Sequence, residues 1–225
     1  FLIKNIWFGY GKPATSALSS NFAPTGLYSP MPNYPAGGDV KAAKAVLDAA
    51  GIKADSSGVR LKGVFDLIPY GEDWRRAGEY LKQVLGDIGI KLELRYEDVP
   101  TWLKRIYHKY DFVMNLNYFY QLPDPVLGVH RHYGTDQIRK GTHFVNSSRY
   151  SNPVLDKLLA SGSVEADATK RNAIYKEVQQ ILAEDMPVVN LFELQFLTVY
   201  NTKLKGATNS AMGAYGSFAE AWIDQ

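Results

Sequence analysis

Between residues 60 and 120 the sequence alternates between segments typical of strands and segments typical of helices. Residues 60–68 and 112–120 alternate and are rich in β-branched or aromatic residues, and residues 91–96 alternate leucines with charges. Residues 72–88 place apolar side chains three and four positions apart, as an amphipathic helix does, and Pro100 opens a further helix. The order strand, helix, strand, helix, strand predicts right-handed crossovers and a mostly parallel sheet covered by helices. An α/β fold is therefore expected.

The flanking regions add helices and one long irregular segment. A helix is expected to be capped by Asp39 and to end at Gly51, where glycine tolerates the left-handed conformation. Residues 9–38 are rich in Gly, Pro, Ser and Asn without periodicity, which predicts an ordered surface excursion with a function. The other expected elements are the end of a helix in 1–8, helices at 153–160 and 167–185, one or two strands in 188–200, and irregular chain in 203–225.

The stretch 110–131, YDFVMNLNYFYQLPDPVLGVHR, is where a ligand site is expected. Its strand ends in a polar turn, and a short helix begins at Asp124-Pro125. α/β proteins place their ligands at such points. The amides and aromatic rings offered there belong to Asn115, Asn117, Tyr118, Phe119, Tyr120 and Gln121. Buried amides must be hydrogen-bonded, and a polar network within the sheet would satisfy them as well as a ligand would. Both interpretations stay open.

Composition narrows the classes of partner. Hydrophobic residues make up 46% and charged residues 21%, as in soluble globular proteins, and the longest apolar runs are too short to span a membrane. The 25 basic and 23 acidic residues are intermixed, with a net charge of +2, so no nucleic-acid partner is expected. Cysteine is absent, which excludes disulfides and thiolate metal sites and fits an exported bacterial protein.

No set of residues calls for a catalytic role. The sequence lacks a Gly-x-Ser-x-Gly elbow, and Gly9 to Lys12 lacks the spacing of a phosphate loop. His130 and His132 are best explained as polar loop residues rather than metal ligands. The carboxylate pairs at 97–98 and 184–185 are explained by helix capping. No catalytic residue, metal or cofactor is therefore predicted. An α/β enzyme that uses His130 or His132 and a chemoreceptor-type or chaperone-like module remain the alternatives.

Several segments, in order and spacing, resemble bacterial extracellular solute-binding proteins of the peptide, nickel and opine importers, the oligopeptide-binding type. The resemblance runs over nearly the whole chain, with the order and spacing of the segments carrying it rather than any single motif. The segments are 7–15 (WFGYGKPAT), 34–51 with KAAKA and AAG, the helix 74–89, Tyr110-Asp111-Phe112, Asp124-Pro125, 150–156 (YSNPVLD) and 171–187.

The resemblance implies the C-terminal lobe of a type II periplasmic binding protein, with a mixed sheet flanked by helices. Residues 1–196 would form this lobe, incomplete at its N-terminus, and residues 197–225 a tail that crosses back to an absent N-terminal lobe. Residues 1–6 lack a start Met and a leader, which suggests a truncated or processed chain. The implied protein is non-enzymatic. It captures a peptide-like or other small polar solute between its lobes and delivers it to an ABC permease, from the periplasm or as an extracellular lipoprotein.

The resemblance also points to individual residues. Gln121 stands where peptide binders carry an aspartate for the α-amino group of the ligand, and a neutral amide cannot make that charge-assisted bond. Tyr118 stands at the place of a tryptophan and keeps a flat ring. Arg105 matches a position where some peptide binders carry an arginine, although a solvated charge on a helix explains it equally well. Phe192 and Glu193 are weaker candidates.

Overall fold

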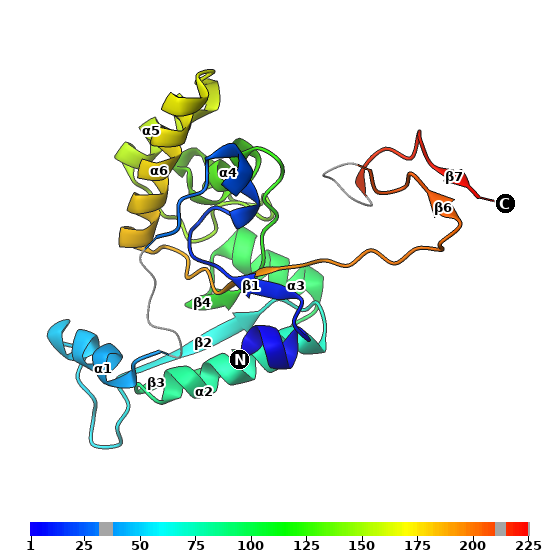
Figure 1. The fold of residues 1–225 in the computed structure, drawn as a ribbon. Coiled ribbons are helices and arrows are strands. Elements are labelled where there is room, and N and C mark those ends of the chain that lie inside the picture. Colours follow the sequence, from blue (N-terminus) through cyan, green and yellow to red (C-terminus); the bar gives the residue numbers. More distant parts are fainter. Residues whose placement is uncertain (32–37, 210–214, 225) are drawn as a thin grey trace.

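The computed structural model describes residues 1–31, 38–209 and 215–224. Its centre is a parallel three-stranded sheet with the order β3-β2-β4, formed by β2 (Leu61–Leu67), β3 (Ile90–Arg95) and β4 (Met114–Leu116). Two antiparallel strand pairs, β1 with β5 and β6 with β7, lie outside this sheet. Figure 1 shows helices along the sheet and a separate helical pair beyond it. The predicted α/β class and the parallel crossovers are confirmed.

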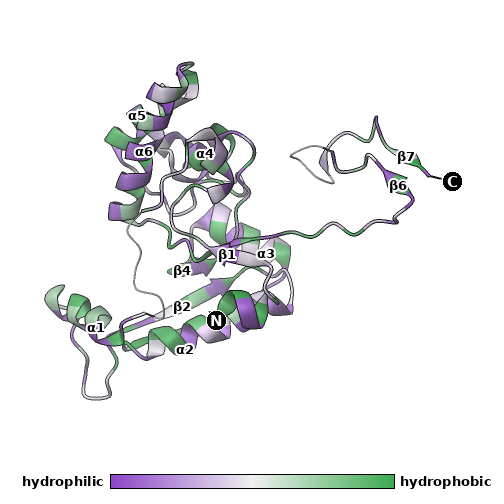
Figure 2. Ribbon diagram, viewed as in Figure 1, coloured by the Kyte–Doolittle hydropathy of each residue, from purple (hydrophilic) through white to green (hydrophobic). Residues whose placement is uncertain are grey.

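One core lies between the sheet and the helices that connect its strands. The helix α2 (Glu72–Gly86) packs on β2 and β3, and α3 (Val99–Leu103) continues into a π-helical turn, η3 (Lys104–Lys109). The contact between α2 and β2 is so close that a Cβ on Gly78 would lie 2.1 Å from a methyl carbon of Leu67. Trp102, Ile106 and Tyr107 fill the core from α3 and η3. Figure 2 shows the hydrophobic stretches along this sheet.

A second core is built around a helical hairpin. Its helices are α5 (Pro153–Val164), capped by Asn152, and α6 (Ala168–Asp185), capped by Asp167. Three short helices, η4 (Pro125–Leu127), α4 (Val129–Tyr133) and η5 (Thr135–Gln137), lie beside the hairpin in sequence and space. The buried side chains include Leu18, Phe22, Leu27, Val129, Leu155, Leu159, Tyr175 and Val178. The two helices were predicted, but α5 runs four residues beyond the expected end at residue 160.

Side chains from distant parts of the chain hold the excursion in place. Within it, η2 (Ser20–Thr25) is the main regular element. The side chain of Gln179, in α6 and completely buried, accepts from Ser29 N at 3.0 Å and Ser16 Oγ at 2.7 Å, and donates to the carbonyl of Leu27 at 2.9 Å. Residues 14–31 are thus ordered, as predicted, but the segment is not confined to the surface, because Leu18, Phe22 and Leu27 are buried in the second core. Residues 32–37 lie outside the described residues.

The remaining elements are short. η1 (Leu2–Ile6) is a helical turn, as expected of residues 1–8, and β1 (Gly11–Pro13) pairs with β5 (Phe192–Leu194). α1 (Val40–Ala49), capped by Asp39, confirms the predicted helix, but none of its residues is buried, so its apolar face is uncovered. Beyond Phe196 the chain runs away from the body to a ribbon of β6 (Leu204–Lys205) and β7 (Trp222–Ile223) (Figure 1). Residues 210–214 and 225 of this tail lie outside the described residues.

Two strands are shorter than predicted. The expected strand 112–120 is regular only over Met114–Leu116. At its C-terminal end the side chain of Asn117 accepts from the N–H of Tyr118 at 2.8 Å and takes that donor from the strand ladder. The expected strands in 188–200 reduce to Phe192–Leu194, whose partner β1 has only three residues. Among the described residues, no helix is long and apolar enough to cross a membrane.

Candidate functional site

Five aromatic side chains gather where β2 and β4 end, and we refer to Tyr70, Trp74, Tyr118, Tyr120 and Phe196 as the aromatic patch. The ring of Tyr118 is at its centre: it stacks on Trp74 at a centroid distance of 5.4 Å and lies 5.8 Å from Tyr70. Tyr120 and Phe196 lie 5.4 and 5.6 Å from Tyr118 and 5.4 Å from each other. Because parallel strands end at the same edge of a sheet, this patch occupies the position at which α/β proteins bind ligands.

The outer rings of the aromatic patch are open to solvent. Tyr70 is 41% exposed, Tyr120 48% and Phe196 57%, whereas Trp74 is buried beneath them. Burial raises the pKa of Tyr118 to about 12, and it raises the pKa of Tyr120 as well. Both phenols therefore stay neutral around pH 7. The patch offers flat apolar faces and hydroxyl groups to a ligand and carries no charge of its own.

The side chain of Gln121 binds the excursion. Its Nε2 donates to the carbonyl of Ala17 at 2.6 Å, and its Oε1 accepts from the N–H of Ser19 at 2.8 Å. Glu193, on β5, binds the next residue and accepts from Ser20 N and Ser19 Oγ, each at 2.8 Å. Gln121 thus satisfies both ends of its amide within the protein. A purely sequence-based comparison cannot show this internal role.

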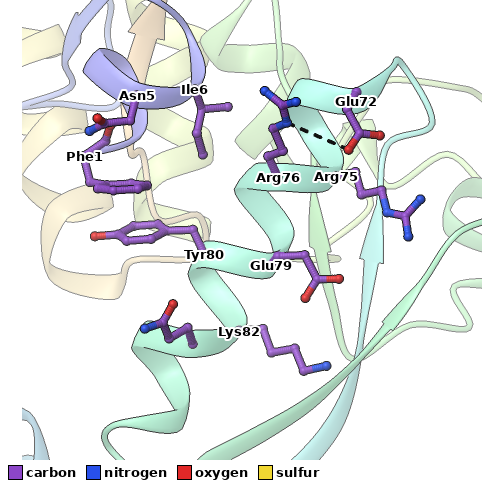
Figure 3. A pocket seen from close by; sticks show the side chains of 10 residues that line it. Phe1, Asn5, Ile6, Glu72, Arg75, Arg76, Glu79, Tyr80 and Lys82 are labelled. Atoms are coloured by element: carbon purple, nitrogen blue, oxygen red, sulfur yellow. Dashed lines mark hydrogen bonds and ion pairs between the residues drawn. The ribbon is translucent and has the colours of Figure 1, made fainter.

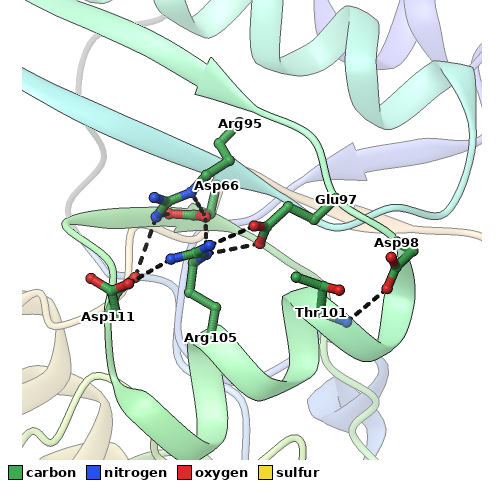
Figure 4. Close-up of polar contacts among 7 residues, drawn as sticks. All are labelled: Asp66, Arg95, Glu97, Asp98, Thr101, Arg105 and Asp111. Atoms are coloured by element: carbon green, nitrogen blue, oxygen red, sulfur yellow. Dashed lines mark hydrogen bonds and ion pairs between the residues drawn. The ribbon is translucent and has the colours of Figure 1, made fainter.

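Arg105 is held in a network of carboxylates on the sheet. Its guanidinium binds Glu97 with two bonds of 2.5 and 2.8 Å and binds Asp111 at 2.5 Å (Figure 4). Asp66, completely buried in β2, lies 3.9 Å from Arg105 and makes two bonds of 2.6 and 2.7 Å to Arg95. Asp66 thereby raises the pKa of Arg95. The structure gives Arg105 the role of joining η3 to the sheet.

The other candidate residues are spread around the aromatic patch. Asn117 donates to the hydroxyl of Tyr107 at 2.9 Å, and Asn115 is half-buried in β4 beside Asp66. The ring of Phe119 lies 3.9 Å from that of His132, toward the second core, and Phe192 packs on Trp7 at 4.7 Å. Of the eight candidates, only Tyr118 and Tyr120 belong to the patch itself.

The sequence analysis did not identify three members of the aromatic patch, Tyr70, Trp74 and Phe196. Tyr70 lies in the turn that follows β2, and β2 is the neighbour of β4. The rule that parallel strands end at one edge could have identified this residue. Phe196 follows the short strand β5, and the sequence carries no signal that would bring it to Tyr118 and Tyr120.

The histidine pair at 130 and 132 lies in the helix α4 and not in a polar loop, which corrects the sequence interpretation. His132 is buried, and His130 contacts Asp136 at 3.1 Å. Within the described ranges, no group of three or more His, Cys, Asp or Glu side chains is placed to hold a metal ion.

The stability of the fold is expected to fall below neutral pH because of His132. Burial, assisted by the charge of Arg131, lowers the pKa of His132 to about 3. The folded state keeps the ring neutral, while the unfolded chain protonates it below about pH 6.5. The free energy of unfolding therefore decreases as the pH falls through 6.5, by about 2 kcal/mol at about pH 5. Urea unfolding at about pH 7.5 and pH 5 measures this loss, which His132→Leu should reduce.

Helix capping explains only part of the paired carboxylates. Asp98 caps α3 by accepting from Thr101 N at 2.8 Å, as predicted. Glu97 binds Arg105 instead, and this bond lowers its pKa. Asp185 accepts from the hydroxyl of Tyr150 and from Asn152 at 3.0 Å, so it joins α6 to the start of α5. All three carboxylates have structural partners.

A hollow of about 730 Å³ lies away from the aromatic patch, between η1 and α2. Figure 3 shows the ring of Phe1 above that of Tyr80, which it stacks on at 4.3 Å, with charged side chains of α2 around them. Glu72 and Arg76 form an exposed pair there at 3.9 Å. The outer rings of the aromatic patch, in contrast, face solvent directly.

Comparison with known proteins assigns the chain to a family. Residues 1–139 match the model of the bacterial extracellular solute-binding proteins, family 5 Middle, and the chain belongs to this family. The structural neighbours are type II periplasmic binding proteins, which confirms the predicted fold class. The resemblance inferred from the sequence motifs is thereby confirmed.

Three relatives illustrate the similarity. The periplasmic murein peptide-binding protein MppA of Escherichia coli K12 is 37% identical over 65 residues, which are 29% of this chain and 12% of MppA. Protein XP55 of Streptomyces lividans is 26% identical over 227 residues, covering 95% of this chain and 40% of XP55. The oligopeptide-binding protein AppA of Bacillus subtilis, solved with a nonapeptide, has a TM-score of 0.80 and 18% identity over 100% of this chain and 45% of AppA. The chain spans less than half the length of each relative.

Proposed function

We propose that this chain is part of the solute-binding component of an ABC importer. The observation that carries the proposal is the aromatic patch at the carboxyl ends of β2 and β4, in a chain of the extracellular solute-binding family. The patch would form one wall of a cleft, and a second lobe would close over a small solute from the other side. Arg105, Asn115, Asn117, Phe119, Gln121 and Phe192 would then support or border this wall, next to Tyr118 and Tyr120.

The solute we propose is peptide-like, or another small polar molecule such as an opine. MppA is named for murein peptides, and AppA was solved with a nonapeptide, which supports this choice of ligand. Residues 1–196 would belong to the lobe described above, and residues 197–225 would reach the other lobe. The extended course of the tail in Figure 1 is compatible with that role.

The proposed protein acts by binding and needs no catalytic group or cofactor. A permease in the membrane would receive the solute, and the location would be the periplasm, as for MppA, or the outer surface of the cell as a lipoprotein. The alternative of an α/β enzyme relied on His130 or His132, and His132 is buried, which argues against a role for that side chain in a reaction. Nothing in the described structure favours a chemoreceptor or chaperone role over transport.

Binding by full-length protein tests the proposal. Calorimetric titration with short peptides, peptides with blocked amino groups, and opines should find a ligand, and Tyr120→Ala should weaken its binding by about 1–3 kcal/mol, the range for a lost stacking contact. Tyr80→Ala is the matched control, because that ring stacks on Phe1 outside the aromatic patch. Indifference to the whole panel, or equal losses in the two variants, would contradict the proposal.

Gln121→Glu tests whether position 121 binds a ligand or the excursion. The substitution replaces the Nε2 donor with an oxygen that faces the carbonyl of Ala17, so the bond of 2.6 Å becomes a repulsion. We expect a loss of about 1–3 kcal/mol in the free energy of unfolding, measured with urea. If the free energy of unfolding is unchanged and the variant gains affinity for free amino groups, residue 121 contacts the ligand rather than the excursion.

A further inference from the structure

We propose that His108 and His143 form a binding site for a divalent metal ion that prefers imidazole ligands, Cu²⁺ or Zn²⁺. The two residues lie 35 positions apart in the sequence, yet their Nε2 atoms are 3.1 Å from each other. Neither residue belongs to the aromatic patch, so the site stands apart from the proposed solute-binding function.

The separation of the two nitrogens suits chelation. Zinc binds imidazole nitrogen at about 2.0–2.1 Å, and two such bonds that end 3.1 Å apart enclose an angle of about 98°. This angle lies between the roughly 90° of square-planar or octahedral coordination and the roughly 109° of a tetrahedron. A metal ion could therefore be bound by both rings with little movement of either. The ring centroids are 5.2 Å apart, so the imidazoles converge at their Nε2 ends.

The backbone on both sides of the pair is fixed. His108 lies in the last turn of η3, directly after the buried Tyr107. The loop that carries His143 is tied to this turn, because Gly141 N donates to the carbonyl of Tyr107 at 2.8 Å. Arg131 donates to the carbonyl of His143 at 3.1 Å. Backbone contacts thus bring the two segments together, and the ring of His143 also lies 5.9 Å from that of Tyr107.

The residue after His143 is held in an unfavourable conformation. Phe144 has a φ of 56°, in the left-handed region that bulky residues rarely adopt. Its ring packs on Tyr107 at 5.6 Å and on Trp102 at 6.4 Å, which keeps it in place. Backbone strain of this kind persists where the surrounding structure enforces it, and it often occurs at ligand sites. Here the conformation of Phe144 constrains the backbone next to His143.

The surroundings select the kind of metal. His108 is exposed and His143 half-buried, so water can complete the coordination sphere. Lys109 and Arg131 are positively charged neighbours, and no third His, Cys, Asp or Glu joins the pair among the described residues. Mg²⁺ and Ca²⁺ prefer oxygen ligands, so two imidazole nitrogens should not bind them. Cu²⁺ binds imidazole more strongly than the other first-row divalent ions, Zn²⁺ included.

The test is a metal titration of untagged full-length protein. Calorimetry should find one equivalent of Cu²⁺ bound, weaker binding of Zn²⁺, and none of Mg²⁺. His108→Gln and His143→Gln should each weaken Cu²⁺ binding roughly tenfold or more, because each removes one of two ligands while a glutamine can still form a hydrogen bond. His130→Gln is the matched control, since His130 contacts Asp136 elsewhere and should leave the affinity unchanged.

Electron paramagnetic resonance of the Cu²⁺ complex provides a second measurement. The spectrum should show coupling to two imidazole nitrogens in the original protein and to one in each of the two glutamine variants. Loss of binding in His130→Gln, or Cu²⁺ affinity that survives both His108→Gln and His143→Gln, would overturn the proposal. A protein that binds no Cu²⁺ would show that the two rings form a hydrogen-bonded pair only. None of these outcomes depends on whether a solute binds at the aromatic patch.

Discussion

Replacing Asp66 with alanine is expected to lower the free energy of unfolding by about 3–5 kcal/mol. The carboxylate is completely buried and receives two hydrogen bonds from Arg95, and its removal leaves the guanidinium groups of Arg95 and Arg105 without their shared counter-charge. Removing one partner of a buried ion pair costs more than the pair contributes, because the remaining charge stays desolvated. Urea unfolding followed by circular dichroism measures the change.

Glu72→Ala is the control for this experiment. Glu72 also pairs with an arginine, Arg76, at 3.9 Å, but both side chains are more than half exposed. Solvent screens such a pair, so the unfolding midpoint of Glu72→Ala should stay close to that of the original protein. Equal destabilisation in the two variants would show that burial of Asp66 does not set the strength of its network.

Gln179→Leu is the second substitution with a large expected effect. It leaves the N–H of Ser29 and the carbonyl of Leu27 without their partner in a buried region, at a cost of about 1–3 kcal/mol for each. The loss should be about 2–6 kcal/mol in total, and residues 14–31 should become sensitive to proteases before the rest of the chain. Limited proteolysis followed by mass spectrometry locates the first cleavage.

Gln180→Leu is the control for this prediction, because Gln180 is the next residue of α6 and is exposed. It replaces the same type of side chain on the same helix but removes none of the hydrogen bonds to residues 14–31. Its protease pattern should match that of the original protein. Cleavage that begins in the sheet of the Gln179→Leu variant would contradict the role given to this side chain.

Local sequence patterns predicted those helices and strands that bury a single apolar face, because the spacing of their apolar residues reveals the type of element. The helix α2 follows from apolar residues at helical spacing, and Asp39, Asp98, Asn152 and Asp167 cap helices as their chemistry suggests. In α6 the hydrophobic pattern is incomplete: Val178 and Leu182 are buried at helical spacing, but the buried stripe also contains Gln179. Hydrophobic periodicity cannot predict a buried glutamine. The side chain of Gln179 is buried because its hydrogen-bond partners, about 150 residues away in the sequence, satisfy its amide.

The sequence pointed to Tyr118 and Tyr120 but not to the other three rings that the structure gathers around them. The end of β4 is where Tyr118 and Tyr120 meet the rest of the aromatic patch, as the strand-to-turn pattern suggested. The amide of Gln121 and the guanidinium of Arg105 looked available from the sequence, but Ala17, Ser19, Glu97 and Asp111 occupy them. Such occupancy depends on tertiary contacts that local sequence does not encode.

The way the excursion is held also determines when it can fold. Its bonds to Gln121, Gln179 and Glu193 join residues 102, 150 and 173 positions apart in the sequence. Closing loops of this length is slow, and these contacts cannot form before their distant partners exist. Residues 14–31 are therefore synthesised early and ordered late. A chain that ends before α6 and β5 lacks Gln179 and Glu193, so residues 14–31 stay accessible to proteases and chaperones. This holds even if the residues between this segment and Gln121 have already folded.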